Sequence, residues 1–114
     1  MKVEKFEDII AWQKARQLSS NVYRIFSSNK DFSFKNQIER ATVSIMNNIA
    51  EGFERQTDKE FKQFLYISKG SCGEVRSMVI LAKDLGYITE SDYSELTAYC
   101  TEISKILAGF IKTL

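Results

Sequence analysis

A row of basic side chains occupies the middle of the chain, and its members recur mostly at intervals of seven residues. The row consists of Arg55, Lys59, Lys62, Lys69, Arg76 and Lys83. Positions seven residues apart are offset by only about 20° around an α-helix. Lys62, Lys69, Arg76 and Lys83 share this spacing, so they fall on one side of a helix. We call the whole set the basic ridge, and we predict that it contacts the phosphates of RNA or DNA. An ordinary solvated helix face is the alternative, because acidic residues lie close by in the sequence.

A second polar group lies in the stretch SIMNNIAEGFER, residues 44–55. If Ile45 marks the buried centre of a helix, Asn48 falls about 60° to one side, and further polar residues continue along that flank. With its expected partners on the next helix, this polar seam comprises Gln37, Arg40, Ser44, Asn48, Glu51, Ser71 and Glu74. An unpaired buried polar group costs about 1–3 kcal/mol, so we expect these half-buried side chains to bond to one another and to set helix register or oligomeric state. A catalytic carboxylate pair of Glu51 with Glu74 is the alternative.

The residue types that most enzymatic sites need are missing. The chain has no histidine, which removes the usual general base and the commonest metal ligand. Cys72 and Cys100 do not form a CxxC pair, and both fall on apolar helical positions, so we expect reduced thiols in the core and no zinc site. The sequence therefore predicts a protein that is not an enzyme, with no metal and no cofactor.

Small residues interrupt one predicted helix in the segment KGSCGE, residues 69–74. Gly70 and Gly73 each cost about 1 kcal/mol relative to alanine inside a helix. We expect them, together with Gly52, to mark places where another backbone packs closely. A phosphate-binding glycine loop is excluded, because no strand precedes the segment and no GK[ST] sequence ends it.

The basic ridge and the polar seam both require helices to position them, and the composition favours an all-helical chain. The chain has 114 residues, no proline and five glycines, which fits one all-α domain spanning residues 1–114. Apolar periodicity predicts helices over about residues 8–28, 34–54, 58–85 and 90–113. The expected N-caps are Ser33, Thr57 and Thr89, and Gly86 is expected to end the third helix. Short connections between long helices predict an antiparallel up-down-up-down four-helix bundle.

The third predicted helix is apolar over more of its circumference than a surface helix needs. Besides a first stripe that begins at Phe61, a second stripe includes Ile67 and Leu81. Two neighbours within a bundle account for most of this width. They would still leave Tyr66 and Ile80 exposed, so we expect the chain to associate with copies of itself.

Charge is balanced overall but uneven along the chain. The net charge is +1; residues 1–83 carry 14 basic and 10 acidic side chains, whereas residues 84–114 carry 2 basic and 5 acidic ones. The last helix is therefore acidic, and it is the candidate docking face if the protein is a protein-binding scaffold without nucleic-acid binding. No apolar run is long enough to cross a membrane and none resembles a secretion signal, which predicts a cytoplasmic protein with no membrane partner.

The polar seam and its surroundings also carry a family resemblance. The residues concerned are Phe6, Trp12, Ala15, Tyr23, Gln37, Arg40, Ala41, Ser44, Ile45, Asn48, Ile49, Ala50, Glu51, Gly52, Arg55, Phe64, Leu65, Gly70, Ser71, Glu74, Leu85, Gly86 and Tyr87. The pattern, above all NIAEG followed by GS-x-x-E, resembles that of the four-helix-bundle proteins of intervening sequences in bacterial 23S ribosomal RNA genes, often called S23 ribosomal proteins. The resemblance spans nearly the whole chain.

The resemblance implies an antiparallel four-helix bundle that assembles as a homopentamer around a central channel. It also links the chain to the accessory variability protein of diversity-generating retroelements, which associates with nucleic acid and with a reverse transcriptase. RNA or DNA and a reverse transcriptase or another protein are therefore expected partners. Proteins of the retroelement type are distinctly basic, whereas this chain is nearly neutral. Taken with the basic ridge, the resemblance predicts a non-enzymatic oligomer that binds RNA, DNA or a nucleoprotein partner.

Overall fold

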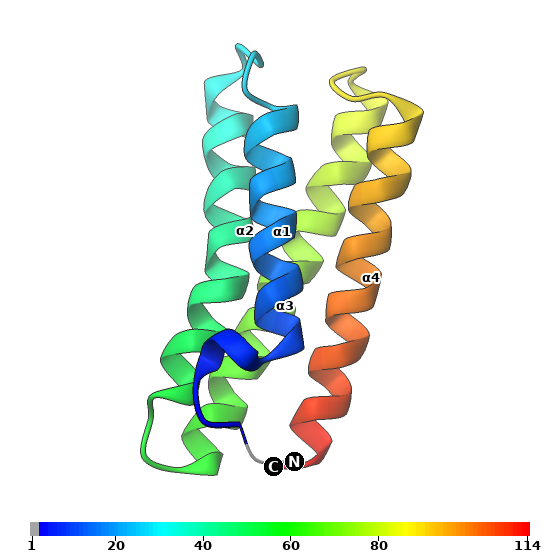
Figure 1. Cartoon of the computed structure of the whole chain (residues 1–114). Coiled ribbons are helices and arrows are strands. Elements are labelled where there is room, and N and C mark those ends of the chain that lie inside the picture. Colours follow the sequence, from blue (N-terminus) through cyan, green and yellow to red (C-terminus); the bar gives the residue numbers. More distant parts are fainter. Residues whose placement is uncertain (1–2) are drawn as a thin grey trace.

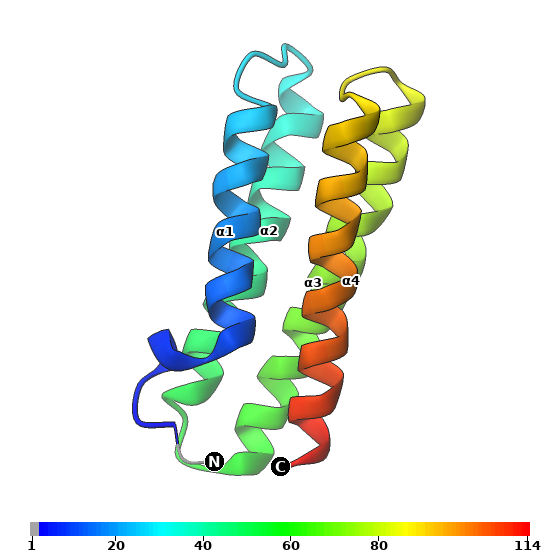
Figure 2. The same ribbon diagram turned by 45° about the vertical axis from the view of Figure 1, so that its right-hand side comes forward.

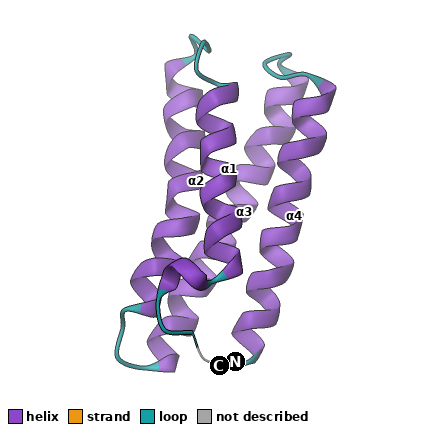
Figure 3. Cartoon of the chain, viewed as in Figure 1, coloured by secondary structure: helices purple, strands orange, loops and turns teal. Residues whose placement is uncertain are grey.

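The computed structural model describes residues 3–114, which form four α-helices and one short 3₁₀ helix (Figure 1). The elements are η1 (Phe6–Asp8), α1 (Ile10–Ile25), α2 (Phe32–Phe53), α3 (Asp58–Asp84) and α4 (Glu90–Lys112). No strand occurs in this part of the chain (Figure 3). The predicted all-α class is confirmed.

The four helices run up and down in turn and form an elongated bundle that measures 43 × 22 × 19 Å along its principal axes (Figures 1 and 2). Helices α1 and α3 each pack against both α2 and α4. The α1–α2 and α3–α4 loops lie at one end of the bundle, and the α2–α3 loop lies at the other end with the C-terminus (Figure 1). The predicted antiparallel up-down-up-down four-helix bundle is confirmed.

The core is built from the predicted apolar stripes of all four helices. Its largest fully buried side chains are Leu18, Val22, Phe26, Ile38, Ile45, Ile49, Leu65, Val75, Val79, Leu96, Ile103 and Leu107. Cys72 and Cys100 are each 1% exposed and are free cysteines. The Cys72 thiol donates to the Cys100 backbone carbonyl oxygen at 3.1 Å. The two cysteines are therefore buried free thiols, as predicted.

Three predicted helix ends are confirmed by their hydrogen bonds. The hydroxyl oxygens of Thr57 and Thr89 accept backbone N–H groups in the first turns of α3 and α4, at 3.1 and 3.0 Å. Gly86 follows α3 with a φ of 72°, in the left-handed region that disfavours residues with a Cβ. The Tyr87 N–H then donates to the Ala82 carbonyl oxygen at 2.9 Å, which is the long bond of a Schellman motif.

The start of the second helix differs from the prediction. α2 begins at Phe32, and its N-cap is Asp31 rather than Ser33: one Asp31 oxygen accepts the Phe34 N–H at 3.2 Å. The other oxygen accepts the Tyr87 hydroxyl at 2.6 Å, which ties the α1–α2 loop to the α3–α4 loop. Both hydrogen bonds hold the pKa of the Asp31 carboxyl below its usual range, and the bond from the Tyr87 hydroxyl has the larger effect. Aspartate caps a helix as well as serine does, and only Asp31 also gains a tertiary partner.

The first helix is shorter than predicted at both ends. Residues 6–8 form η1 in place of the first turn of α1. Ile9 follows with an extended backbone, ψ 121°, and its side chain is only 4% exposed. Burying an isoleucine side chain stabilises the fold by about 1.5–3 kcal/mol, which exceeds the free energy that one more helical residue would contribute. α1 then ends at Ile25, before the expected end at Ser28.

Candidate nucleic-acid interface

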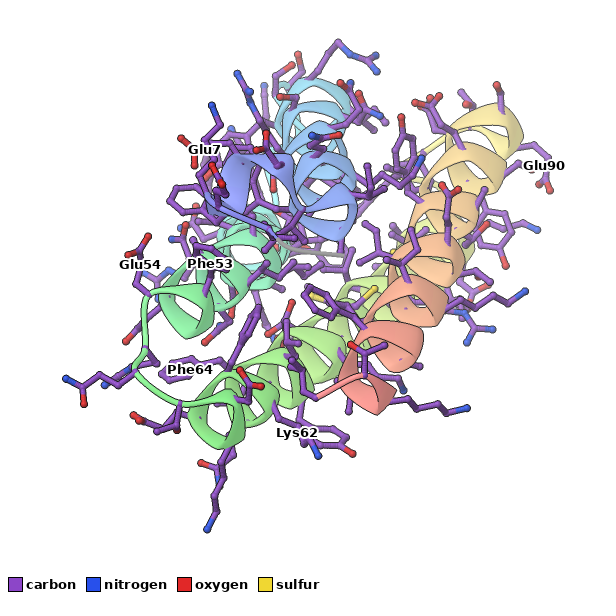
Figure 4. All side chains as sticks on the ribbon, turned by 60° about the horizontal axis from the view of Figure 1, so that its bottom comes forward. Glu7, Phe53, Glu54, Lys62, Phe64 and Glu90 are labelled. Carbon is purple, nitrogen blue, oxygen red and sulfur yellow. The ribbon has the colours of Figure 1, made fainter. Side chains whose placement is uncertain are left out.

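Three members of the basic ridge, Lys69, Arg76 and Lys83, lie on the side of α3 that borders α4. Lys69 and Arg76 line a groove of about 400 Å³ between the two helices, and Lys105 of α4 lines the same groove. Nearer the α2–α3 loop, Figure 4 shows Lys62 and Phe64 on opposite sides of α3, with Phe64 toward the end of α2. The structure therefore brings part of the ridge to one helix boundary. Lys105 joins it there, although the heptad spacing of the ridge gives no sign of this residue.

The two ends of the ridge are neutralised by carboxylates of the chain itself. Arg55 pairs with Glu51 at 3.0 Å, and its guanidinium lies over the Phe64 ring, 4.7 Å from the ring centroid. Lys83 pairs with Glu90 at 3.2 Å, which links α3 to α4. Exposed pairs of this kind add little stability, but they leave less positive charge free for a ligand. Arg55 and Lys83 are thus the weakest phosphate-contact candidates of the ridge.

The middle of the ridge has no such partners. Lys59, Lys62, Lys69 and Arg76 form no ion pair with any residue between 3 and 114, and neither does Lys105. The groove is lined by Lys69, Cys72, Gly73, Arg76, Cys100, Thr101, Ser104, Lys105 and Ala108. It therefore presents three positive charges and no carboxylate.

The positive charge of the groove acts on the buried thiols beneath it. The pKa of the Cys72 thiol is lowered, first by its contact with the Cys100 thiol, then by a hydrogen bond with the Ser104 backbone and last by the charges of Lys69 and Arg76, while burial opposes the shift. The contact between the two thiols and burial both raise the pKa of Cys100. Lys69 and Arg76 therefore contribute only the smallest part of the shift at Cys72.

The acidic side chains of α4 are largely bonded within the chain. Besides the ion pair of Glu90, Glu102 pairs with Lys14 at 3.1 Å, and Glu95 accepts the Asn21 amide at 2.9 Å. Asn21 is 5% exposed, and its bond joins α1 to α4. Sequence reasoning missed this contact, because an asparagine beside an apolar stripe gives no sign of its partner on a distant helix. The acidic face expected for a docking partner is correspondingly reduced.

The structure brings the centre of the polar seam together. The hydroxyl oxygens of Ser44 and Ser71 lie 2.9 Å apart across α2 and α3. The Asn48 amide donates to both the carbonyl and the hydroxyl oxygen of Ser44, at 2.8 and 2.9 Å. Gln37 donates to Glu74 in a longer bond of 3.4 Å. These contacts link the two helices, while a role in setting register or oligomeric state stays a prediction.

The outer members of the seam differ from the prediction. Glu51 and Glu74 are exposed rather than half-buried, and Gln37 and Arg40 are exposed as well. Glu51 bonds to Arg55, whereas Glu74 accepts the bond from the seam's glutamine. Each carboxylate thus has a separate partner, so the alternative of a catalytic pair gains no support. Within residues 3–114, no three His, Cys, Asp or Glu side chains are grouped so as to hold a metal ion.

The three glycines of the prediction have two kinds of surroundings. A Cβ added at Gly52 would lie 2.6 Å from the Phe64 Cβ, so α3 approaches α2 closely at this point. Nothing lies within 4 Å of the corresponding position at Gly70 or Gly73, and both are exposed. The close approach expected at these two glycines is not made within the described chain. A backbone that packs closely against them would have to belong to a second molecule.

Exposed apolar side chains flank Gly70 and Gly73 on α3. Tyr66, Ile67, Ile80, Leu81 and, directly after the last residue of α3, Leu85 are 57%, 53%, 42%, 47% and 50% exposed, and we call them the apolar face of α3. The exposure of Tyr66 and Ile80 was predicted. The expectation that neighbours within the bundle would cover most of the second stripe is wrong for the other three, because α2 and α4 bury only the first stripe fully. No helix in the described range is itself long and apolar enough to cross a membrane.

Comparison with known proteins places the fold in a family. The family model described as 23S rRNA-intervening sequence protein matches residues 7–109, a range that includes parts of all four α-helices. A crystal structure of a protein with unknown function from the S23 ribosomal protein family of Bacteroides thetaiotaomicron is similar, with a TM-score of 0.85 and 27% identity, over 90% of this chain and 99% of that one. No curated protein matches the chain. The chain belongs to the 23S rRNA-intervening sequence protein family.

Proposed function

We propose that this protein is a non-enzymatic oligomer that binds RNA or DNA through the middle of the basic ridge. One observation carries the proposal: Lys62, Lys69 and Arg76 have no acidic partner within residues 3–114, whereas the ends of the ridge and most acidic groups of α4 do. Unpaired cations on a folded surface attract anions from solution. Because Lys62, Lys69 and Arg76 also share one side of α3, a polyanion that lies along this helix could contact all three.

The dimensions of the ridge suit an extended polyanion. Heptad positions are separated by about 10.5 Å along a helix axis, so Lys62 and Arg76 are roughly 21 Å apart along α3. This length exceeds the Debye length of about 8 Å at physiological ionic strength, so one small anion cannot interact strongly with both Lys62 and Arg76. A nucleic-acid backbone presents several phosphates over such a length, whereas a single small anion spans only part of it.

Self-association through the apolar face of α3 is part of the same proposal. An interface there would bury side chains such as Tyr66 and Ile80, and it would offset the cost of Gly70 and Gly73, which is about 1 kcal/mol each. Following the family resemblance, we propose a homopentamer located in the cytoplasm. The resemblance also makes a reverse transcriptase or another nucleoprotein component a candidate partner.

A protein-binding scaffold without nucleic-acid binding is the second candidate. The apolar face of α3 favours it, because such a face suits a different protein as well as a second copy of the chain. The acidic side of α4 supports it less, since Glu90, Glu95 and Glu102 are already bonded within the chain. Nucleic-acid binding separates the two candidates.

Fluorescence anisotropy with labelled structured RNA and duplex DNA tests the first candidate. At about 50 mM salt we expect binding, and at about 200 mM salt we expect it to be much weaker, because phosphate contacts release counterions. The triple variant Lys62→Glu, Lys69→Glu and Arg76→Glu should abolish binding and keep the mass of the oligomer. Unchanged affinity in this variant would overturn the assignment to the ridge.

A matched variant separates the ridge from net charge. Lys5→Glu, Arg24→Glu and Lys30→Glu change the charge by the same amount at exposed cations outside α3 that form no ion pair within residues 3–114. We expect this variant to retain most of the affinity. If both triple variants lose binding equally, non-specific charge accounts for the affinity. If the wild type does not bind even at low salt, the scaffold is the better account.

Sedimentation velocity tests the proposed assembly. Tyr66→Glu together with Ile80→Glu should reduce the oligomer to single chains with unchanged helix content. Tyr23 and Phe32 are 48% and 64% exposed outside α3, so their replacement by glutamate is the control and should leave the mass unaltered. A wild-type protein that sediments as a single chain at micromolar concentration would overturn self-association.

A further inference from the structure

The groove between α3 and α4 differs from the rest of the ridge, because donors line it from both helices. α3 contributes Lys69 and Arg76, and α4 contributes Lys105 together with the hydroxyls of Thr101 and Ser104. Its volume of about 400 Å³ corresponds to roughly a dozen water molecules of about 30 Å³ each. A phosphate group with part of its hydration shell therefore fits.

The donors of this groove have no competing partners in the chain between residues 3 and 114. Its three cations form no ion pair there. The Thr101 and Ser104 hydroxyls make no hydrogen bond to that part of the protein, in contrast to the Thr97 hydroxyl, which donates to a backbone carbonyl oxygen at 2.8 Å. No carboxylate lines the groove to repel an anion.

We propose that the groove is a binding subsite for a phosphate group. The guanidinium of Arg76 has the fork geometry that matches two phosphate oxygens. Lys69 and Lys105 supply the remaining positive charge from opposite sides, and the hydroxyls of Thr101 and Ser104 supply neutral donors. The inference rests on the proposed function, within which the groove is the point where a nucleic-acid backbone is held most firmly.

Two lysines distinguish this subsite from the ridge as a whole. Lys105 lies in the groove but on α4, outside the ridge, whereas Lys62 lies on the ridge but outside the groove. Lys105→Gln should therefore weaken binding of a small phosphate compound by about fivefold, the effect of one charged contact at a solvent-accessible site. Lys62→Gln is the matched control and should leave that binding unchanged while it weakens binding of long RNA.

The test is a nuclear magnetic resonance titration of the isotope-labelled full chain with two probes. Inorganic pyrophosphate represents a free phosphate compound, and a single-stranded RNA of about 12 nucleotides with hydroxyl ends carries only backbone phosphates. The signals to follow are the backbone amides of Thr101 and Ser104 and the side-chain Nε–H of Arg76. We expect all three to shift with both probes and to respond more weakly in Lys105→Gln.

Each outcome decides between the subsite and the wider function. If pyrophosphate shifts the groove signals but RNA does not bind, the subsite stands as a site for free phosphate compounds and the proposed nucleic-acid function fails. If RNA binds through the ridge while the groove signals stay still with both probes, the subsite is overturned and the proposed function survives. If neither probe binds, both are overturned.

Discussion

The two sides of α3 use polar residues in opposite ways. On the side toward α2, Ser68 is fully buried and donates to the Ile45 carbonyl oxygen at 2.7 Å, and Ser71 contacts the Ser44 hydroxyl at 2.9 Å. On the side toward α4, Lys69 and Arg76 line an open groove and bond to no acidic group among residues 3–114. Polar residues with partners in the chain hold the bundle together, whereas those without one remain free for a ligand.

The physical reason for this difference is burial. A buried polar group that loses its partner costs about 1–3 kcal/mol, so the α2 side must be satisfied inside the chain. An exposed lysine stays hydrated and needs no partner. Substitutions toward α2 should therefore change stability, and substitutions toward α4 should change binding.

The largest effect is expected at the close approach of α3 to α2. Gly52→Ala would place its Cβ 2.6 Å from the Phe64 Cβ and 3.0 Å from a Phe61 ring carbon. Overpacking of this kind should destabilise the protein by about 1–3 kcal/mol in urea unfolding. Gly109→Ala is the control, because nothing lies within 4 Å of its Cβ position, and it should stabilise α4 by up to about 1 kcal/mol. A Gly52→Ala protein as stable as the wild type would contradict the close approach.

A smaller loss is expected from the buried serine on the same side. Ser68→Ala removes the donor to the Ile45 carbonyl oxygen and should lower the free energy of unfolding by about 1 kcal/mol. Ser77 is exposed on α3, so Ser77→Ala should change that free energy by less than about 0.5 kcal/mol. Equal effects of the two variants in urea unfolding would show that the cross-helix hydrogen bond adds no stability.

A pH dependence should reveal the polar contact between the two loops at one end. The pKa of Asp31 is lower in the folded protein than its unfolded value of about 3.9, first because of the Tyr87 hydroxyl. The unfolded chain therefore binds this proton more readily, so the contribution is complete above the unfolded pKa and is lost as the pH falls through the folded one. Between about pH 5 and pH 2.5, wild-type protein should lose more stability than Tyr87→Phe. The same loss in both proteins would contradict this account.

The smallest effect on stability is expected in the groove. Lys69→Gln combined with Arg76→Gln removes two cations that have no acidic partner within residues 3–114. The free energy of unfolding should change by less than about 0.5 kcal/mol, as at other surface positions. Thermal unfolding followed by circular dichroism would check this, and a large loss would mean that these residues serve the fold.

Features fixed by local sequence could be predicted. The Thr57 cap and the left-handed Gly86 depend on residues within one turn, and the apolar stripes follow from helical periodicity alone. The cap at Asp31 was missed, because its advantage over Ser33 comes from Tyr87, which is far away in the sequence. Helix-capping preferences rank aspartate and serine equally. Only the contact between the two folded loops favours Asp31.

The candidate site could be predicted only in part for the same reason. The spacing of the ridge shows which cations share a side of α3, but not that carboxylates neutralise Arg55 and Lys83. Nor does the spacing bring in Lys105, because that requires knowing which side of α4 meets α3. A count of charges along the sequence makes α4 look like an acidic surface. It does not show that Glu90, Glu95 and Glu102 of α4 are bonded to other residues of the chain.

The salt dependence of RNA binding would show whether the middle of the basic ridge holds phosphates. Each phosphate contact contributes about 0.7 to the slope of the logarithm of affinity against the logarithm of salt concentration for single strands. Lys69→Gln with Arg76→Gln should therefore reduce the magnitude of that slope by roughly 1.4, whereas Lys5→Gln with Lys30→Gln should leave it unchanged. A slope that is the same in wild type and both double variants would contradict the claim that the unpaired middle of the ridge holds the nucleic acid.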